Sequence, residues 1–309
     1  MKDRTISHLT LADFGSIDLS IPVITYGSGR PILSLLTGVH GNETAGLFVI
    51  EQLVRALPDF AGQLRIIPSA NPVAQALDLR VSPRDPMDLN RIFPGNADGQ
   101  LPERIAFQLM KLLSDSDCVI DFHSFDLRNP VVAIFSNSGD EAVRRRSFQC
   151  IEAFAPVMIW QLNPERSAGV AYRGALAPAL HERDVANFAV EMPHHGRMTQ
   201  EILDASVDGV RSVMGVLGMT ETKLAPPAAP IPIFGREEFF SPHSGLFFPT
   251  QDIMTEVRAD QVLGRLTSIT RFEDMEIRAP FDGTLLQIHG RAFVITGTSI
   301  YAMGHLIDV

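Results

Sequence analysis

Two histidines and two glutamates in this sequence have the types and spacing needed to bind a metal ion and move a proton. His40 and Glu43 lie three residues apart in the segment His40-Gly-Asn-Glu43, so both can contact one ion from a single turn of chain. His123 and Glu191 each follow an apolar run that predicts a buried strand. Each motif taken singly is more often structural. Together, two histidines and one carboxylate match the ligands of a catalytic zinc site with an open position for water, and Glu191 is then the candidate general base.

A second segment carries positive charge. It runs from Arg80 to Gly95 and contains Asn90 and Arg91 beside the turn-forming pair Pro94-Gly95. Arg91 can hold a substrate carboxylate while Asn90 donates a further hydrogen bond. The alternative is a surface loop whose arginines have no role, and spacing alone leaves both interpretations open.

The elements around these residues predict an α/β domain. Between about residues 30 and 217, apolar strand-like runs alternate with helical patterns, which favours a largely parallel or mixed sheet flanked by helices. Ligands bind beyond the carboxyl ends of the strands in such sheets, and the four candidate residues all fall there. The expected strands cover 32–39, 64–67, 118–122, 131–135, 157–162 and 187–190. The expected helices cover 44–57, a segment that begins at Pro102, 143–154 and 202–217.

The pattern changes after residue 223. Residues 224–232 form a proline-rich connector, which composition predicts to be extended and semi-rigid. Residues 233–309 contain short β-type runs separated by glycines and no helical period. We therefore expect a catalytic α/β domain over 1–223, a linker over 224–232 and a small all-β domain over 233–309.

The site motifs together resemble the succinylglutamate desuccinylase/aspartoacylase family, which is related to the zinc carboxypeptidases. The resemblance covers roughly residues 30–220 and rests on four motifs: His40-Gly-Asn-Glu43, Asp88-Leu-Asn-Arg-Ile-Phe-Pro-Gly95, Asp121-Phe-His123-Ser and Glu191. It implies a zinc-carboxypeptidase-like fold and a zinc-dependent enzyme that removes an acyl group from an N-acylated amino acid. It further implies one Zn²⁺ per chain on His40, Glu43 and His123. Glu191 is then the catalytic carboxylate, Asn90 and Arg91 grip the substrate carboxylate, and Arg80 faces the oxyanion.

Two departures from the family pattern leave alternatives open. The stretch from Arg80 to Asn90 is a few residues longer than in the shorter aspartoacylases, so Arg84 competes with Arg80 for the oxyanion role. His194 and His195 follow Glu191 where the family more often has a glycine, and they are expected on an exposed loop. Asp121, two residues before His123 on the same side of a strand, either orients that histidine or satisfies backbone donors.

The C-terminal segment has a resemblance of its own. Ile277-Arg-Ala-Pro280-Phe-Asp-Gly283-Thr and the region 297–304 are similar to the barrel-sandwich of lipoyl and biotinyl carrier domains. Such carriers attach their cofactor to a lysine, and residues 233–309 contain none. We therefore expect no covalent lipoate or biotin here. Structural packing is the favoured role, with bounding the active site or self-association as alternatives.

Composition and charge narrow the function further. The net charge of -10 argues against a nucleic-acid partner, and the longest apolar runs are too short to span a membrane. Only Cys118 and Cys150 are present, too few for a disulfide scaffold. With no secretory signal at the start, a cytoplasmic location is expected. No GxSxG elbow or phosphate-binding GxxxxGK[ST] loop occurs.

These observations predict a zinc-dependent deacylase acting on a small N-acyl amino acid, with no nucleic-acid or membrane partner and a possible homo-oligomeric state. Two rival functions remain. A metallocarboxypeptidase would use the same chemistry on short peptides, and a non-catalytic binding protein would keep the fold without hydrolysis.

Overall fold

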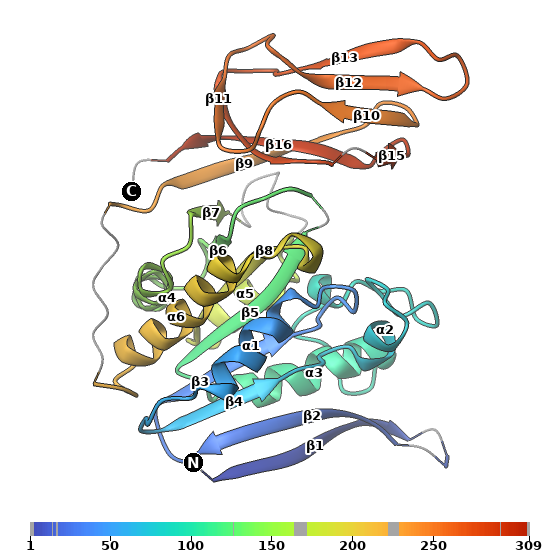
Figure 1. Cartoon of the computed structure of the whole chain (residues 1–309). Helices are drawn as coiled ribbons and strands as arrows, with labels where there is room; N and C mark the ends of the chain where they lie inside the picture. The colour runs from blue at the N-terminus through green and yellow to red at the C-terminus, as the bar shows by residue number, and fades with distance from the viewer. Residues whose placement is uncertain are drawn as a thin grey trace.

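A single mixed sheet connects almost the whole chain (Figure 1). The computed structural model describes residues 3–13, 15–16, 18–125, 127–163, 172–221, 229–290 and 292–307. Among these residues the sheet has 12 strands in the order β1-β2-β4-β3-β5-β8-β6-β7-β9-β16-β14-β11. A second sheet has 4 strands in the order β13-β12-β10-β15.

The strands of the large sheet are β1 (Arg4–Asp13), β2 (Asp18–Gly27), β3 (Ile32–Thr37), β4 (Gln63–Ile67), β5 (Cys118–Phe125), β6 (Val132–Ser136), β7 (Met158–Leu162), β8 (Ala186–Pro193), β9 (Ile233–Phe240), β11 (Thr255–Val257), β14 (Gly283–Ile288) and β16 (Ser299–Leu306). Those of the small sheet are β10 (Gly245–Pro249), β12 (Val262–Ser268), β13 (Asp274–Arg278) and β15 (Ala292–Val294). The helices are α1 (Ala45–Arg55), α2 (Pro72–Ala76), α3 (Leu101–Leu113), α4 (Glu141–Phe154), α5 (Leu176–His181) and α6 (Gln200–Val216), with short 3-10 turns η1 (Leu89–Arg91) and η3 (His195–Arg197).

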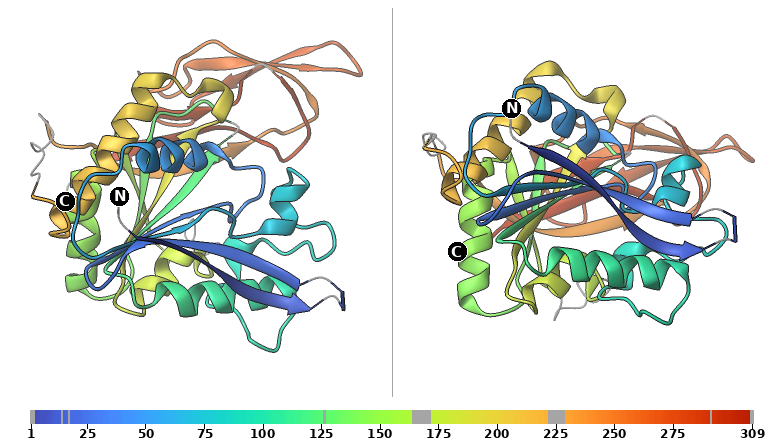
Figure 2. Two further views of the ribbon diagram at one scale, coloured as in Figure 1. Left: turned by 60° about the horizontal axis from the view of Figure 1, so that its bottom comes forward. Right: turned by 90° about the horizontal axis from the view of Figure 1, so that it is seen from below.

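Helices cover both faces of the central strands (Figure 2). Helices α1, α4 and α6 pack on one face, where their apolar stripes join buried side chains of β3, β4, β5 and β8 in one core. Helices α3 and α5 pack on the other face and close a second core. This layering follows from the helical period of the apolar residues, since each amphipathic helix must bury one stripe.

The α/β elements expected from the sequence are confirmed, with ends that differ by a few residues. Three features were not anticipated: the hairpin β1–β2 at one edge of the sheet, and the short helices α2 and α5. Of the proline-rich connector, residues 224–228 lie outside the described residues. Cys118 and Cys150 are both free and buried.

The C-terminal region is all-β in its described residues, as expected, and it extends the large sheet. Strand β9 pairs in parallel with β7 through Ile159↔Ile233 and Trp160↔Phe234. A second link joins Arg128 to Ile288 in β14 by two backbone hydrogen bonds of 2.9 and 3.2 Å. The C-terminal strands are therefore fixed against the α/β part by backbone pairing as well as by side chains.

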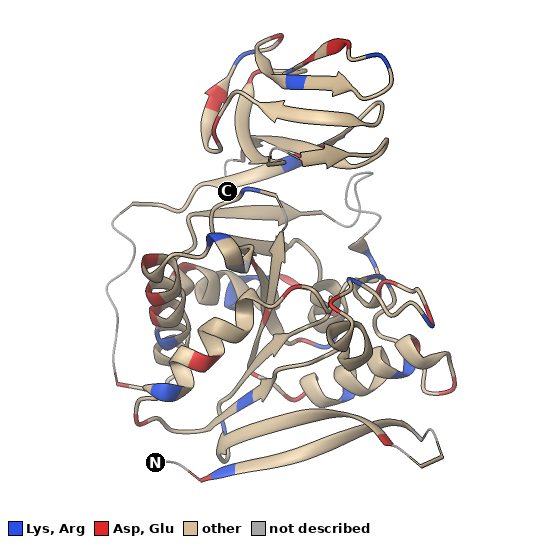
Figure 3. Cartoon of the chain, turned by 45° about the vertical axis from the view of Figure 1, so that its right-hand side comes forward, with Lys and Arg blue, Asp and Glu red and all other residues tan. Residues whose placement is uncertain are grey.

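Among the described residues, no helix combines the length and apolar character needed to cross a membrane. In the view of Figure 3, basic and acidic residues are interspersed over helices and strands.

Candidate active site

The loop between β3 and α1 presents His40 and Glu43. A Cβ on Gly41 would lie 2.1 Å from the backbone carbon of Ala74, so only glycine allows the loop to approach helix α2 this closely. The backbone nitrogen of Glu43 donates to the carbonyl oxygen of His40 at 3.2 Å. This tight turn directs both side chains to the same side, where both are buried.

His123 and Glu191 come from adjacent strands. Strands β5 and β8 pair in parallel, and His123 lies opposite Glu191 in the register. Strand β3 flanks β5 on its other side, also in parallel. Because the three strands end at the same edge of the sheet, His40, Glu43, His123 and Glu191 meet there, in the arrangement that the sequence predicts.

Three of these side chains have the geometry of a metal site. His40, Glu43 and His123 offer ligand atoms that all lie within 4.8 Å of one another, and all three residues are buried. The two Glu43 oxygens lie 2.8 Å from His40 Nδ1 and 2.8 Å from His123 Nδ1 respectively. His40 Nδ1 makes no hydrogen bond within the described residues in spite of this proximity. A divalent ion with nitrogen and oxygen ligands fits this donor set.

A carboxylate lies behind each imidazole. His40 Nε2 is 3.1 Å from Asp88 Oδ1, and His123 Nε2 is 2.8 Å from Asp121 Oδ2. Metal-binding histidines commonly donate their remote N–H to such a partner, which fixes the tautomer and the ring orientation. Asp121 therefore orients His123, one of the two roles that the sequence left open.

The electrostatics of the cluster favour positive charge between the carboxylates. Burial by itself would lower the pKa of His123, but Asp121 and Glu43 raise it well above its ordinary value. Burial by itself would raise the pKa of Glu43. The imidazoles of His40 and His123 outweigh the effect of burial, so the pKa of Glu43 is lowered. A site that holds its carboxylate ionised and attracts cations suits a divalent metal.

Glu191 differs from the other carboxylates of the site. Burial is the main cause that raises its pKa to about 7; Glu43 adds to the effect and His123 opposes it. Its Oε2 has no hydrogen-bond partner within the described residues. A carboxylate with a pKa near neutrality and a free oxygen can accept a proton and release it again.

A cavity of about 250 Å³ opens over these residues. Arg80, Asn90 and Arg91 line it, together with all four residues described above. Arg80 donates to Glu43 Oε1 at 3.1 Å and to Asp88 Oδ2 at 3.0 Å, so it lies directly beside the candidate metal ligands.

Asn90 and Arg91 lie in the turn η1. Asn90 Oδ1 accepts a hydrogen bond of 2.9 Å from the backbone nitrogen of Leu176, which leaves its amide nitrogen as the group that can donate into the cavity. The guanidinium carbon of Arg91 lies 4.4 Å from the ring centroid of Tyr172. Stacking on this ring fixes the direction of the arginine.

The competing arginine lies elsewhere. Arg84 is exposed, is 3.6 Å from Asp85 and is absent from the cavity wall. Of the two arginines, Arg80 is therefore the one that lies beside the candidate metal ligands. His194 is half-buried in the loop after β8; the side chain of His195 lies outside the described residues.

Sequence reasoning missed several residues of the cavity. Asp88 binds His40, Arg80 and the backbone nitrogen of Asn90, and its place two residues before Asn90 was the available signal. Tyr172, Trp160 and Glu238 also line the wall. Glu238 comes from the C-terminal region, so no local pattern could have connected it to the site.

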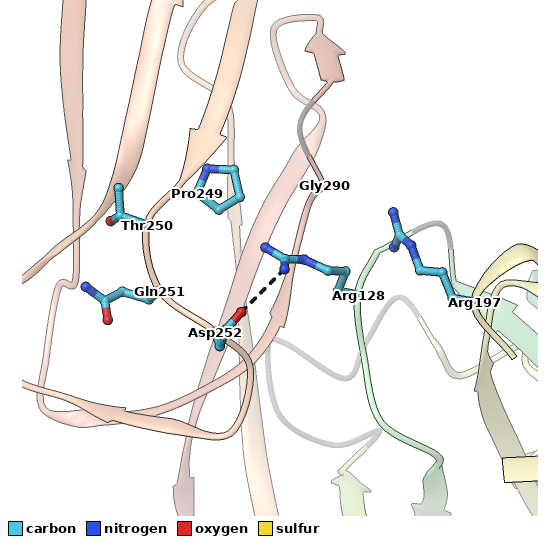
Figure 4. A pocket seen from close by; sticks show the side chains of 7 residues that line it. All are labelled: Arg128, Arg197, Pro249, Thr250, Gln251, Asp252 and Gly290. Carbon is cyan, nitrogen blue, oxygen red and sulfur yellow. Dashed lines mark hydrogen bonds and ion pairs between the residues drawn. The ribbon is translucent and has the colours of Figure 1, made fainter. Parts of the chain in front are cut away.

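A second cavity, of about 450 Å³, lies where the α/β part meets the C-terminal strands. Arg128 and Arg197 line it on one side and residues 249–252 on the other; in Figure 4 the side chains of Thr250 and Gln251 point away from the two arginines. Arg128 Nη1 lies 3.4 Å from Asp252 Oδ1, so an ion pair crosses the junction. None of the four predicted metal and proton-transfer residues lines this cavity.

Comparison with known proteins agrees with the fold and the site. Residues 30–217 match the model of the succinylglutamate desuccinylase/aspartoacylase catalytic domain. The chain belongs to the succinylglutamate desuccinylase/aspartoacylase family, as the motifs predicted.

Individual relatives extend the similarity beyond the matched domain. The chain is 29% identical over 310 residues to the N-alpha-acetyl-L-2,4-diaminobutyric acid deacetylase of Halomonas elongata, covering 96% of this chain and 88% of that protein. A solved succinylglutamate desuccinylase from Silicibacter sp. shares 26% identity with a TM-score of 0.84, over 99% of this chain and 95% of that one. The product-bound ectoine utilization protein EutE (DoeB) from Ruegeria pomeroyi shares 25% identity with a TM-score of 0.85, over 98% and 94%. Membership of this family supports a hydrolase that acts on amides.

Proposed function

We propose that this protein is a zinc-dependent deacylase that hydrolyses the amide bond of a small N-acyl amino acid. The observation that carries the proposal is one arrangement: three convergent ligand atoms, a carboxylate behind each imidazole and an unpaired oxygen on Glu191. His40, Glu43 and His123 would hold one Zn²⁺. The bound ion would polarise the scissile carbonyl and make a water molecule acidic enough to act as a nucleophile near neutral pH.

Glu191 moves the proton in this proposal. Its free Oε2 accepts the proton that the attacking water loses, and the same oxygen then donates it to the leaving nitrogen. The amide C–N bond breaks, and the products are a carboxylic acid and a free amino acid. A pKa of about 7 suits both halves of this transfer, because the carboxylate must gain and lose a proton at the same pH.

The arginines bind and polarise the substrate. Arg91 pairs with the substrate carboxylate, and the amide nitrogen of Asn90 donates a further hydrogen bond. Arg80 lies next to Glu43, where its guanidinium can stabilise negative charge on the carbonyl oxygen. Fixing the carboxylate at one point and the carbonyl at another places the scissile bond beside Glu191.

The relatives suggest the first substrates to test. The Halomonas elongata relative is named for deacetylation of Nα-acetyl-2,4-diaminobutyrate, and others for desuccinylation. The decisive assay compares Glu191→Gln with the unchanged protein, both loaded with zinc, on acetyl and succinyl amino acids. We expect Glu191→Gln to retain zinc and to lose about 10²- to 10⁴-fold in kcat. Near-normal turnover by the zinc-loaded variant would refute the assigned role.

A metallocarboxypeptidase remains the second candidate, because the same site could cut the terminal residue from a peptide. The cavity volume of about 250 Å³ favours the smaller acyl amino acid. Comparing N-acyl amino acids with di- and tripeptides in one assay separates the two functions. A binding protein without catalysis would hydrolyse neither.

Three further properties belong to the proposal. We place the enzyme in the cytoplasm, with a homo-oligomeric state to be tested by light scattering. We divide the chain into a catalytic domain over 1–223, a linker over 224–232 and a β domain over 233–309. We also propose that this β domain is a lipoyl-like barrel-sandwich that bounds the active site and carries no covalent cofactor.

A further inference from the structure

The C-terminal region contributes one charged side chain to the cavity, Glu238 of strand β9. Residues Arg236 and Glu238 are two apart on this strand and therefore point to the same side. Glu237 between them points the other way and is exposed. The side chain of Glu238 is 30% exposed, and the residue lines the cavity.

Glu238 is held in place by its neighbours. Its Oε1 accepts hydrogen bonds from Arg236 Nη2 at 2.6 Å and from Ser299 Oγ at 3.4 Å. Its Oε2 takes part in no hydrogen bond among the described residues. An ionised carboxylate oxygen is an acceptor only, so the cavity offers one fixed acceptor at this point.

Arg236 pairs with Oε1 of Glu238 from outside the cavity wall. Its guanidinium is almost fully buried, with 3% of the side chain exposed. It bonds Gln287 Oε1 at 2.8 Å and lies 4.0 Å from the ring centroid of Trp160. It is absent from the cavity wall. Of this ion pair, a molecule in the cavity can therefore contact the carboxylate and not the guanidinium.

Two aromatic rings lie between the Glu238 carboxylate and Arg91, the arginine proposed to bind the substrate carboxylate. Arg91 stacks on Tyr172, and the rings of Tyr172 and Trp160 contact edge to face with centroids 6.0 Å apart. Trp160 in turn lies against Arg236, which holds Glu238. The cavity thus has a cation at one end of an apolar strip and an anion at the other.

We propose that Glu238 is a specificity-determining residue that binds a primary ammonium group at the end of the substrate side chain. This proposal rests on the function proposed above, in which Arg91 holds the substrate carboxylate. The substrate class is then an Nα-acylated diamino acid, whose methylene groups lie along Tyr172 and Trp160. A substrate with an acidic side chain would instead place a carboxylate against Glu238, which costs affinity because like charges repel.

The test compares pairs of substrates that differ only in charge. The full-length zinc-loaded protein is assayed on Nα-acetyl-2,4-diaminobutyrate and Nα-acetylornithine against the uncharged N-acetylnorvaline and N-acetylnorleucine, with N-acetylglutamate as the acidic probe. We expect kcat/KM to fall in the order cationic, uncharged, acidic. In Glu238→Gln, the ratio of cationic to uncharged kcat/KM should fall about 10- to 100-fold. Glu237→Gln, on the opposite side of the same strand, should keep the ratio of the unchanged protein.

Three results would overturn the proposal: no preference for the cationic substrate in the unchanged protein, an equal loss on both substrates in Glu238→Gln, or the same change of ratio in Glu237→Gln. Thermal unfolding of Glu238→Gln shows whether the ion pair with Arg236 is needed for folding. If the variant does not fold, the substrate preference of the unchanged protein still tests the proposal. If none of the substrates is hydrolysed, the proposed function fails. Calorimetry then still tests Glu238 by comparing the binding of 2,4-diaminobutyrate and norvaline. The diamino acid should bind more tightly only if the Glu238 carboxylate accepts a hydrogen bond from its side-chain ammonium group.

Discussion

Asp121→Asn tests the assignment of the metal site most directly. Asp121 Oδ2 lies 2.8 Å from His123 Nε2, and the residue is only 5% exposed. Asparagine keeps an oxygen that can accept the hydrogen bond but removes the negative charge. His123 then becomes a poorer ligand, because the carboxylate no longer increases the basicity of the ring. We expect zinc affinity to fall about 10- to 100-fold, which corresponds to about 1.4 to 2.7 kcal/mol.

The other carboxylate behind an imidazole gives a graded comparison. Asp88 lies 3.1 Å from His40 Nε2, its side chain is 25% exposed, and it is shared with Arg80 and the backbone nitrogen of Asn90. Water screens a partly exposed charge more than a buried one. Asp88→Asn should therefore weaken zinc binding less than Asp121→Asn. Asp98→Asn, on an exposed turn, is the matched control.

Competition with a chelating dye of known zinc affinity measures the effect on metal binding. Folding must be followed separately, because Asp121 Oδ1 is buried without a hydrogen-bond partner among the described residues. The new amide nitrogen could be left unpaired there at a cost of about 1 to 3 kcal/mol. Urea unfolding of the metal-free proteins gives that cost. If Asp121→Asn binds zinc as tightly as the Asp98→Asn control, His123 is not a ligand through Nδ1 and the site is misassigned.

Three further predictions concern substrate binding, the loop of the site and the core. Arg91→Lys should raise KM about tenfold, because lysine cannot form a two-pronged pair with a carboxylate; steady-state kinetics on one acyl amino acid measures it, and an unchanged KM contradicts the role of Arg91. Gly41→Ala should destabilise the protein by more than about 1 kcal/mol and weaken zinc binding, because the new Cβ would lie 2.1 Å from the backbone of Ala74. In the control Gly196→Ala the nearest contact of the Cβ is 3.7 Å, so stability and zinc binding should both stay unchanged. Burial lowers the pKa of His181 to about 4, below the unfolded value of about 6.5, so the unfolded state binds the proton first as the pH falls. The free energy of unfolding should therefore drop by about 2 kcal/mol between pH 7 and pH 5 from this residue alone, and His181→Gln should remove that part of the slope in urea titrations.

The sequence predicted which candidate residues lie together because they follow a local rule. His40, His123 and Glu191 each come at the end of an apolar run, and parallel strands bring such ends to one edge of a sheet. Glu43 was predicted from its spacing to His40 taken together with the other motifs. The pattern was therefore sufficient to predict that these four side chains come together, even though the order of the strands was unknown.

The supporting residues could not be predicted in the same way. Asp88 contacts His40 from 48 positions along the chain, and its role depends on how the loop from Arg80 to Asn90 folds back. The hairpin β1–β2 pairs with β4, an interaction that joins residues far apart in sequence. Such pairings depend on three-dimensional contacts that no single segment encodes.

The boundary between the α/β part and residues 233–309 also depends on a contact between segments distant in sequence, and this contact shapes the cavity. Composition separates residues 233–309 from the α/β part, whereas backbone pairing of β9 with β7 joins them in one sheet. Strand β7 carries Trp160 and strand β9 carries Glu238, so one pairing builds a wall of the cavity from both regions. The groups proposed to bind the metal and move the proton all lie within residues 30–217. Substitutions in β9 can therefore change which substrate fits while leaving the metal ligands and Glu191 in place.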